Sequence, residues 1–282
     1  MTGVFLFMQT PAKINLYLKV LGKRQDGYHE IETIFWPIAS VCDDVEIELR
    51  ESGGLSMSCD GASEGVPCDE RNLCVKAAEA FRNVVGDFSA HINLTKRIPV
   101  AAGMGGGSSD AAAVLLELRR LIAPKMNDDE LQEIAVKLGA DVPFFLNPVP
   151  CVARGIGEKR ERIVVQGAPS LVLVHPRFPV PASWAYAHCE KNVENNASIE
   201  TMLSAMAAGD WKTVEANVRN DLEIGIFRKY PILCMIRERL EELGVRNVHI
   251  SGSGPVMFGF KGANNDVLDV IEKEFEIVEG IR

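Results

Sequence analysis

The sequence lacks the long apolar run that a membrane-spanning helix requires. Such a helix needs roughly 20 consecutive apolar residues, and no stretch of the 282-residue chain approaches that length. Residues 1–8, MTGVFLFM, are apolar but have no basic flank, so we expect a first β-strand there rather than a signal peptide. A leader rich in arginine and serine is also missing, which favours a bacterial cytoplasm as the location.

Metal and disulfide patterns are missing as well. The chain has seven cysteines, an odd number, with irregular spacing and no Cys-x-x-Cys pair. A disulfide framework or a zinc site is therefore not expected. The five histidines form no His-x-x-x-His pair, so we predict no protein-held metal.

Positive charge is also in short supply. The formal net charge is −9 and the pI is near 5.2, whereas a protein that tracks nucleic acid needs an electropositive face. The basic pairs at 23–24, 96–97 and 119–120 are isolated, and we interpret them as solvated surface side chains. We predict neither nucleic acid nor a membrane as a partner. Backbone amides and one or two lysines still suffice to bind a polyanionic ligand.

The composition, 47% hydrophobic and 24% charged, is typical of a folded globular protein. Residues 12–20 alternate between apolar and polar, which predicts a half-buried strand with Lys13 and Asn15 on one face. Further strands are expected at 44–50 and 89–95, a glycine- and serine-rich loop at 52–65, and a helix at 72–85.

A nearly all-apolar segment after Ser108 predicts a helix that is buried on most of its circumference. The next helix is expected to begin near Asn127, with Glu130 completing a capping box, and to stop at Gly139. Asp141 lies just past that stop.

The second half alternates helices and strands, which indicates a compact α+β domain. Glycines and prolines around 167–181 suggest a boundary, and we divide the chain at 1–165 and 166–282. The expected strands are 171–174, 245–250 and 256–260, and the expected helices are 198–208, 210–221, 231–243 and 265–275.

The segment PVAAGMGGGSSDAA at 99–112 carries the strongest chemical signal. Glycines allow a close approach of the backbone and positive φ, and a helix N-terminus directly behind them offers unpaired N–H groups to phosphate. A flexible hinge with a serine N-cap is the alternative interpretation. The segment is no Walker A loop, because no Gly-Lys-Ser/Thr follows. It also fails the dinucleotide fingerprint, and the signatures of protein kinases are missing.

Three ordered motifs resemble the GHMP kinases, the superfamily of galactokinase, homoserine kinase, mevalonate kinase and phosphomevalonate kinase. They are PAKINL at 11–16, the glycine-rich segment at 99–109, and SGSGP at 251–255. The resemblance spans nearly the whole chain. It implies an α+β, two-domain GHMP kinase fold, with a ribosomal-protein-S5-like, ATP-binding N-terminal domain and a ferredoxin-like C-terminal domain. ATP and the acceptor are expected to meet in a cleft between them.

Three further segments resemble one branch of that superfamily: DGYHE at 26–30, GADVPFF at 139–145, and NDLE at 220–223. This branch implies transfer of phosphate from ATP, with Mg²⁺, to the 2-hydroxyl of 4-diphosphocytidyl-2-C-methyl-D-erythritol in non-mevalonate isoprenoid synthesis. The partner is then a small molecule carrying cytidine diphosphate, and the enzyme is a monomer or homodimer. The resemblance does not indicate which serine meets Mg²⁺.

The resemblance also implies roles for individual residues. Asp141 matches the catalytic aspartate and Lys13 the lysine that pairs with it. Tyr28, His29 and Tyr186 are expected to contact the cytidine end of the substrate, and Asn15 is expected to contact the substrate beside Lys13. Trp184 is close enough to Tyr186 to be the alternative aromatic. Ala182 departs from the family pattern, in which a hydroxyl residue is common at this position. The nucleotide contacts are Pro99, Ala102, Gly103, Met104, Gly105, Gly106, Gly107, Ser108 and Ser109, together with Asn72 and Lys96 near the base.

Simpler interpretations remain for several of these residues. Asp141 follows a helix stop and precedes Val-Pro, a context that also suits turn capping. Lys13 can be an ordinary surface lysine, the aromatics can be core residues, and Asp221 can be a helix-end residue. Two alternative functions remain: another GHMP kinase of the homoserine or mevalonate type, and a non-catalytic GHMP-fold regulator.

Overall fold

The computed structural model describes residues 5–190, 196–262 and 276–277. The chain forms two compact units, and their sequence ranges interleave. Unit 1 takes Met1–Ala12, Ile38–Val100 and Gly105–Pro148, and unit 2 takes Lys13–Pro37, Ala101–Met104 and Val149–Arg282. The two longest strands, β1 (Phe5–Lys23) and β2 (His29–Arg50), each contribute residues to both units. The division into domains at 1–165 and 166–282, expected from the sequence, stays a prediction.

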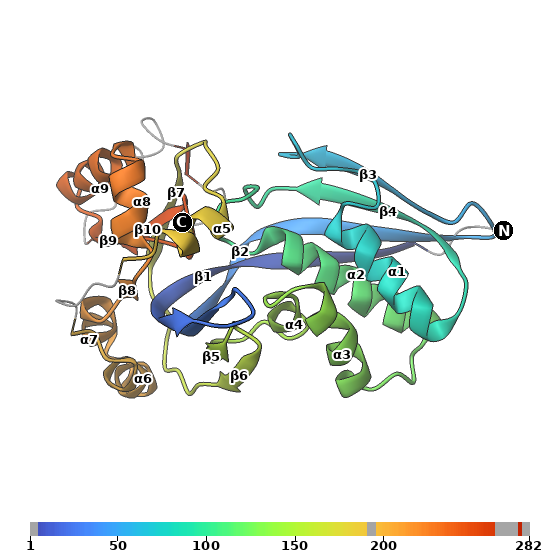
Figure 1. Cartoon of the computed structure of the whole chain (residues 1–282), viewed down its shortest axis with the longest axis horizontal. Coiled ribbons are helices and arrows are strands. Elements are labelled where there is room, and N and C mark those ends of the chain that lie inside the picture. The colour runs from blue at the N-terminus through green and yellow to red at the C-terminus, as the bar shows by residue number, and fades with distance from the viewer. Residues whose placement is uncertain (1–4, 191–195, 263–275, 278–282) are drawn as a thin grey trace. The chain divides into compact units, whose positions relative to one another are not determined.

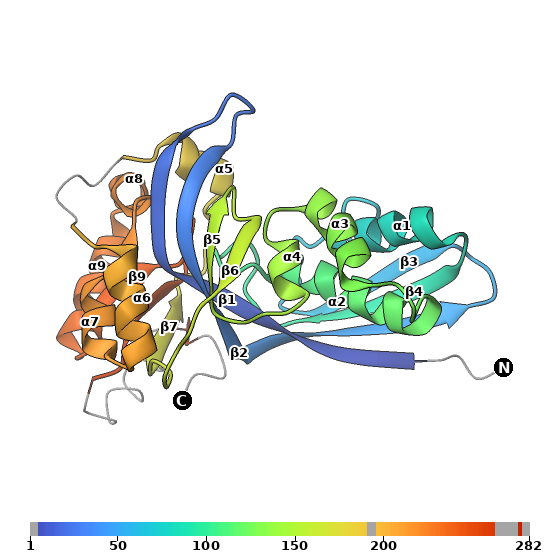
Figure 2. The same cartoon turned by 90° about the horizontal axis from the view of Figure 1, so that it is seen from below.

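Unit 1 is a sheet with helices on one side. β4 (Ser89–Lys96) pairs antiparallel with the second half of β2 and parallel with β3 (Leu55–Gly61). Along β4, residues alternate between buried and half-buried, because one face of the strand carries the core. The helices are α1 (Leu73–Val85), α2 (Gly106–Ile122), α3 (Asp128–Leu138) and α4 (Val142–Phe145). Figures 1 and 2 show all four gathered on one side of β3 and β4.

Three predicted helices of unit 1 are confirmed. α2 has nine buried residues, as its apolar sequence predicts. α3 begins after the capping box formed by Asn127 and Glu130. It ends before Gly139, but the φ of Gly139 is 168°, so this glycine is extended rather than left-handed. The prediction of a loop at 52–65 is wrong in part, because β3 forms within this range.

Unit 2 contains two groups of strands. β8 (Arg219–Asn220) pairs with β1, while β5 (Cys151–Gly155) pairs with the first half of β2 and with β6 (Lys159–Arg162). A second, antiparallel sheet has the order β11 (Glu276–Ile277), β7 (Leu171–His175), β10 (Met257–Phe260), β9 (Arg246–Ile250). The helices are α5 (Ala182–Ala187), α6 (Ile199–Ala208), α7 (Trp211–Ala216), α8 (Glu223–Lys229) and α9 (Ile232–Glu242).

The predicted strands of the second half are confirmed, and α8 and α9 lie beside β9 (Figure 1). The helix expected at 210–221 ends at Ala216, because the chain turns there into β8 and joins β1. The helix expected at 265–275 lies outside the described residues. α4, α5, α8, β5 and β6 were not predicted.

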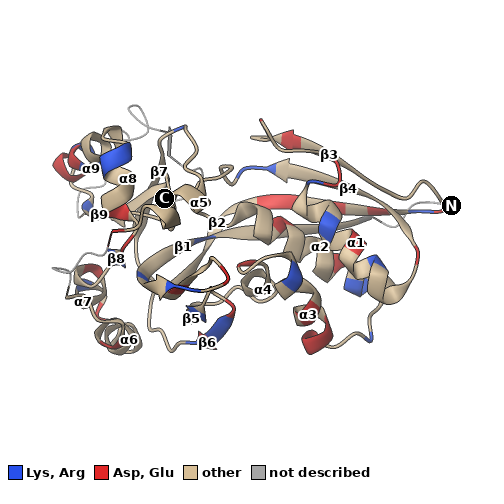
Figure 3. Cartoon of the chain, in the orientation of Figure 1, with Lys and Arg blue, Asp and Glu red and all other residues tan. Residues whose placement is uncertain are grey.

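Charged residues of both signs are interspersed over the elements (Figure 3). The arginines of the three basic pairs each have a carboxylate partner: Arg24 with Asp26 and Glu30, Arg97 with Asp44, Arg119 with Asp128, and Arg120 with Glu117. At each of the three basic pairs, nearby carboxylates therefore offset the positive charge of the arginines. Among the residues described, no helix has the length and apolar character to cross a membrane, and no cluster of His, Cys, Asp and Glu is suited to hold a metal.

Candidate active site

The glycine-rich segment turns at Gly103 and Gly105, whose φ angles are +77° and +73°. Such angles strongly favour glycine. At Gly103 sterics add to this preference, because a Cβ there would lie 2.0 Å from the carbonyl oxygen of Ser251. The prediction of positive φ in this segment is confirmed.

Gly105 is the N-cap residue of α2, with no side-chain capping hydrogen bond. The N–H of Ser109 is bonded to Gly105 O, and the N–H groups of the preceding turn have no acceptor within the helix. The serine N-cap of the hinge interpretation is therefore wrong, since Ser108 and Ser109 both lie inside α2. This end of α2 presents backbone donors and a positive dipole end, which is the arrangement that holds a phosphate.

Gly106 and Gly107 face different surroundings. A Cβ at Gly106 would lie 3.0 Å from Ile98 Cγ2 and 3.0 Å from Lys96 Nζ, whereas a Cβ at Gly107 would meet nothing within 4 Å. Gly106 is therefore needed for packing within unit 1, and Gly107 borders open space.

The two serines also differ. Ser109 is buried, its hydroxyl donates to Pro11 O at 2.6 Å, and its carbonyl accepts from Thr10 Oγ1 at 2.9 Å. Ser108 is half-buried. Ser109 thus ties α2 to β1, and Ser108 is the less buried serine at the helix end.

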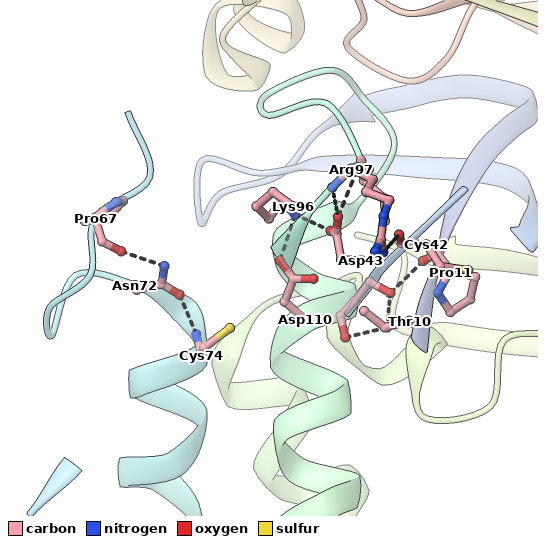
Figure 4. Close-up of polar contacts among 12 residues, drawn as sticks. Thr10, Pro11, Cys42, Asp43, Pro67, Asn72, Cys74, Lys96, Arg97 and Asp110 are labelled. Carbon is pink, nitrogen blue, oxygen red and sulfur yellow. Dashed lines mark hydrogen bonds and ion pairs between the residues drawn. The ribbon is translucent and has the colours of Figure 1, made fainter. Parts of the chain in front are cut away.

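Lys96 lies between two buried carboxylates, those of Asp43 and Asp110 (Figure 4). Its Nζ is 2.8 Å from Asp110 Oδ2, and the side chain is 4% exposed. Asp43 also accepts from the backbone N–H groups of Arg97 and Ile98. The interpretation of this lysine as a solvated surface residue is wrong, and its role near the nucleotide base stays a prediction.

Protonation of this buried group follows from its surroundings. Burial raises the pKa of Asp110 to about 8; Lys96 lowers the pKa and Asp43 raises it. Burial alone would lower the pKa of Lys96, but the carboxylates of Asp110 and Asp43 raise it above the ordinary value. One ammonium therefore balances one carboxylate, and Asp110 retains a proton near neutral pH.

Asn72 is the N-cap residue of α1 (Figure 4). Its Oδ1 accepts from the N–H of Cys74 at 2.8 Å, and its Nδ2 donates to Pro67 O at 2.7 Å. The side chain is 7% exposed. A contact between Asn72 and the nucleotide base stays a prediction.

Lys13 and Asn15 point to the same face of β1, as predicted. Lys13 Nζ donates to Asn15 Oδ1 at 2.7 Å and to Gly103 O at 3.2 Å. Both side chains are buried, at 5% and 4% exposure. The prediction that this strand is half-buried and the interpretation of Lys13 as a surface lysine are therefore both wrong, because both faces of β1 are covered between Ala12 and Leu18. A buried ammonium is tolerated only where it is paired or hydrogen-bonded, and Lys13 meets this requirement through Asn15 and Gly103.

Asp141 is the N-cap residue of the short helix α4, but its side chain makes no capping hydrogen bond. The capping interpretation is therefore wrong. Asp141 is half-buried, and its pairing with Lys13 stays a prediction.

The hairpin between β1 and β2 presents Tyr28, which is 60% exposed. The N–H of Tyr28 donates to Asp26 Oδ1 at 3.1 Å. The next ring, that of His29, stacks on Tyr186 with centroids 5.4 Å apart and an interplanar angle of 27°. Burial lowers the pKa of His29, and the charge of Lys23 lowers it further, so this imidazole is neutral at pH 7.

Trp184 has different neighbours. It stacks on His188 at 4.4 Å and meets Tyr230 edge-on at 5.8 Å, against the apolar core of unit 2. Of the two competing aromatics, Tyr186 is the one brought beside His29, which favours it for the cytidine end.

Several residues that hydrogen-bond to these groups were not singled out in the sequence: Thr10, Asp43, Asp110, Asn220 and Thr33, whose hydroxyl oxygen accepts from Asn15 Nδ2 at 2.8 Å. Asn220 belongs to the NDLE segment, a signal that was present but assigned no role. Asp221 is no mere helix-end residue, because its Oδ2 accepts from Val20 N at 2.9 Å and its Oδ1 from Arg219 at 2.6 Å.

Asp110→Asn is expected to remove a pH dependence of stability. A carboxyl whose pKa is raised by folding keeps its proton in the folded state, so the free energy of unfolding falls as pH rises between the unfolded and folded pKa values. Between about pH 5 and pH 8.5, the variant should gain more than about 1 kcal/mol on the wild type, the equivalent of one pKa unit. Urea unfolding across this range measures the difference.

Asp44→Asn is the matched control. The hydrogen bond from Arg97 lowers the pKa of Asp44, so this group titrates below the tested range and its loss should leave the slope unchanged. Parallel pH profiles for the wild type and Asp110→Asn would contradict the assignment.

Two family sequence models match the chain. The model described as GHMP kinases N terminal domain matches residues 72–147, and that described as GHMP kinases C terminal matches residues 202–276. Curated relatives named 4-diphosphocytidyl-2-C-methyl-D-erythritol kinase include that of Geobacter metallireducens, 39% identical over 256 residues and covering 90% of this chain and 88% of the relative. That of Clostridium novyi is 38% identical over 257 residues, with 90% of each covered.

Solved structures agree with this. A crystal structure of 4-(cytidine 5'-diphospho)-2C-methyl-D-erythritol kinase has a TM-score of 0.78 and 35% identity, covering 95% of this chain and 94% of that chain. A homoserine kinase from Cytophaga hutchinsonii has a TM-score of 0.75 at 16% identity, over 95% of this chain and 88% of that one, and shares the fold. The chain belongs to the GHMP kinase family and has its two-domain fold of mixed helices and strands.

Proposed function

We propose that this chain is a small-molecule kinase that transfers the terminal phosphoryl group of ATP to the 2-hydroxyl of 4-diphosphocytidyl-2-C-methyl-D-erythritol. The observation that carries the substrate assignment is the name shared by the relatives, at 39% and 38% identity over nine-tenths of this chain. The aromatic group of Tyr28, His29 and Tyr186 supports it, since a pyrimidine needs an aromatic face and edge-directed hydrogen bonds. A cytoplasmic location accords with the use of ATP.

The N-terminus of α2 is the proposed phosphate site. Gly107 borders open space there, and the half-buried Ser108 supplies a hydroxyl, because the hydroxyl of Ser109 already donates to Pro11 O. The Mg²⁺ that accompanies ATP would neutralise charge on the phosphates, and Ser108 is the residue of α2 suited to meet it. Pro99 and the segment Ala102–Met104 are proposed to line the same nucleotide site.

Substitutions at the two adjacent glycines should separate binding from folding. In Gly107→Val, the side chain enters open space where the phosphates are proposed to lie, so the KM for ATP should rise at least about tenfold, the loss of one charge-assisted hydrogen bond. The melting temperature should stay near that of the wild type. Steady-state kinetics and thermal unfolding measure both.

Gly106→Ala is the contrasting variant. Its methyl group would press on Ile98 and Lys96, so it should lower the melting temperature. An unchanged KM for ATP in Gly107→Val would contradict the phosphate site.

Asp141 and Lys13 are proposed to serve the transfer step. A carboxylate is too weak a base to deprotonate an alcohol fully in the ground state, but phosphoryl transfer passes through a loose transition state in which the nucleophile is little bonded. Asp141 therefore orients the hydroxyl and accepts its proton late. Lys13, held by Asn15 and Gly103 O, supplies positive charge that offsets charge on the transferred group.

Asp141→Asn should fold normally, bind cytidine nucleotide as the wild type does, and lose turnover by about 10²–10⁴-fold, the usual contribution of general-base assistance. Stopped assays for kcat and calorimetric titration with cytidine diphosphate test this. Asp87→Asn, an exposed aspartate of unit 1, is the control and should keep full activity. Turnover near the wild-type value would remove Asp141 from the mechanism.

An acceptor panel tests the function as a whole. Purified protein with Mg²⁺ and ATP is offered 4-diphosphocytidyl-2-C-methyl-D-erythritol, mevalonate, homoserine and galactose, and ADP release is measured. Release with the first acceptor alone is expected. Turnover of another acceptor would overturn the substrate, and ATP binding without any turnover would favour a non-catalytic regulator.

A further inference from the structure

Asn220 makes three hydrogen bonds from a buried position at the end of β8. Its Nδ2 donates to Ile250 O and to Gly252 O, both at 2.8 Å, and its Oδ1 accepts from Leu222 N at 3.0 Å. The side chain is 6% exposed, and Asn220 is in register with Leu18 of β1. One amide thus joins β8 to the turn that follows β9.

That turn, residues 251–255, is a tight loop that contacts the glycine-rich segment. Gly252 and Gly254 have φ angles of +55° and +73°. Ser251 Oγ donates to Gly103 O at 3.0 Å, and Val256 N donates to Ala102 O at 3.3 Å. The position of the turn therefore determines the position of Ala102 and Gly103.

The same turn lies directly against Lys13 and Asn15. A Cβ at Gly252 would lie 3.0 Å from Asn15 Oδ1 and 3.7 Å from Lys13 Nζ. Gly103 O accepts from Lys13 Nζ at 3.2 Å, and Lys13 N donates to Met104 O at 2.9 Å. A displacement of the turn by a few tenths of an ångström therefore reaches the ammonium group of Lys13.

We propose that Asn220 is a positioning residue for Lys13, acting through the 251–255 turn and the carbonyl of Gly103. The role of Lys13 in phosphoryl transfer rests on the function proposed above; the mechanical connection from Asn220 to Lys13 does not. Asn220 is suited to this task because two donors on one rigid amide define the separation of two carbonyls on either side of Ser251. A misplacement of catalytic groups by about 1 Å can lower turnover by about 10²-fold.

Asn220→Asp tests the proposal with little change of shape. The carboxylate can still accept from Leu222 N, but it offers no donor to Ile250 O and Gly252 O. Asn217→Ala is the matched control, because Asn217 also bridges two backbone groups in unit 2, Thr213 O and Ser198 N, without contacting the turn. Asn220→Asp should lower kcat about 10- to 100-fold, whereas Asn217→Ala should keep the wild-type kcat.

A second measurement does not depend on kinase activity. The rate at which an amine-reactive acylating reagent modifies Lys13 is followed by mass spectrometry, with Lys96 as the internal reference, because Lys96 is equally buried but lies in unit 1. Loss of two buried hydrogen bonds should raise the Lys13 rate about tenfold or more and leave that of Lys96 unchanged.

The outcomes separate the two proposals. An unchanged Lys13 rate, or an equal rise at Lys13 and Lys96, would overturn the positioning role and leave the proposed function standing. If the Lys13 rate rises selectively in Asn220→Asp but the wild-type protein phosphorylates none of the acceptors, the positioning role is supported and the proposed function is overturned. A selective rise together with the loss of kcat supports both.

Discussion

The carbonyl oxygen of Gly103 accepts two hydrogen bonds, one from the ammonium of Lys13 and one from the hydroxyl of Ser251. This arrangement requires a left-handed backbone at Gly103 and leaves no space for a side chain. The first strand, the glycine-rich segment and the turn after β9 therefore meet at one atom. The three family motifs, far apart along the chain, contribute a residue each to this contact.

Buried charge imposes the second constraint. Lys96, Asp43 and Asp110 are almost fully removed from water, which is tolerated only where charges are paired and hydrogen-bonded. The group sits beneath the first turn of α2, where Gly106 packs against Lys96. The helix end that is suited to phosphate is thus supported from within unit 1 by an ion-paired lysine. Because Asp110 retains a proton, the ammonium of Lys96 is balanced by the carboxylate of Asp43 and no excess negative charge is buried.

Local pattern predicted the elements that carry strong signals within their own segment. α2 has an apolar stretch following its glycines, and α3 has a capping box, so both were found with their ends nearly correct. β3 was missed because Gly53 and Gly54 precede it and Gly61 ends it, and its parallel hydrogen bonds are made to β4, a segment about 35 residues away. β8 was missed for a similar reason, since two residues gain strand geometry only by pairing with β1.

The sequence by itself determined the family, the order of the motifs and the shared face of Lys13 and Asn15, because these depend on residue identity and on a period of two. The tertiary structure decided which of these side chains are buried and what they contact. A surface position was the simpler interpretation of both Lys13 and Lys96, yet each is enclosed by residues distant in sequence. The choice of Tyr186 over Trp184 beside His29, and of Ser108 over Ser109 at the helix end, likewise depended on neighbours that only packing brings together. Burial and hydrogen-bond partnership are properties of the assembled core, and a single chain segment does not contain them.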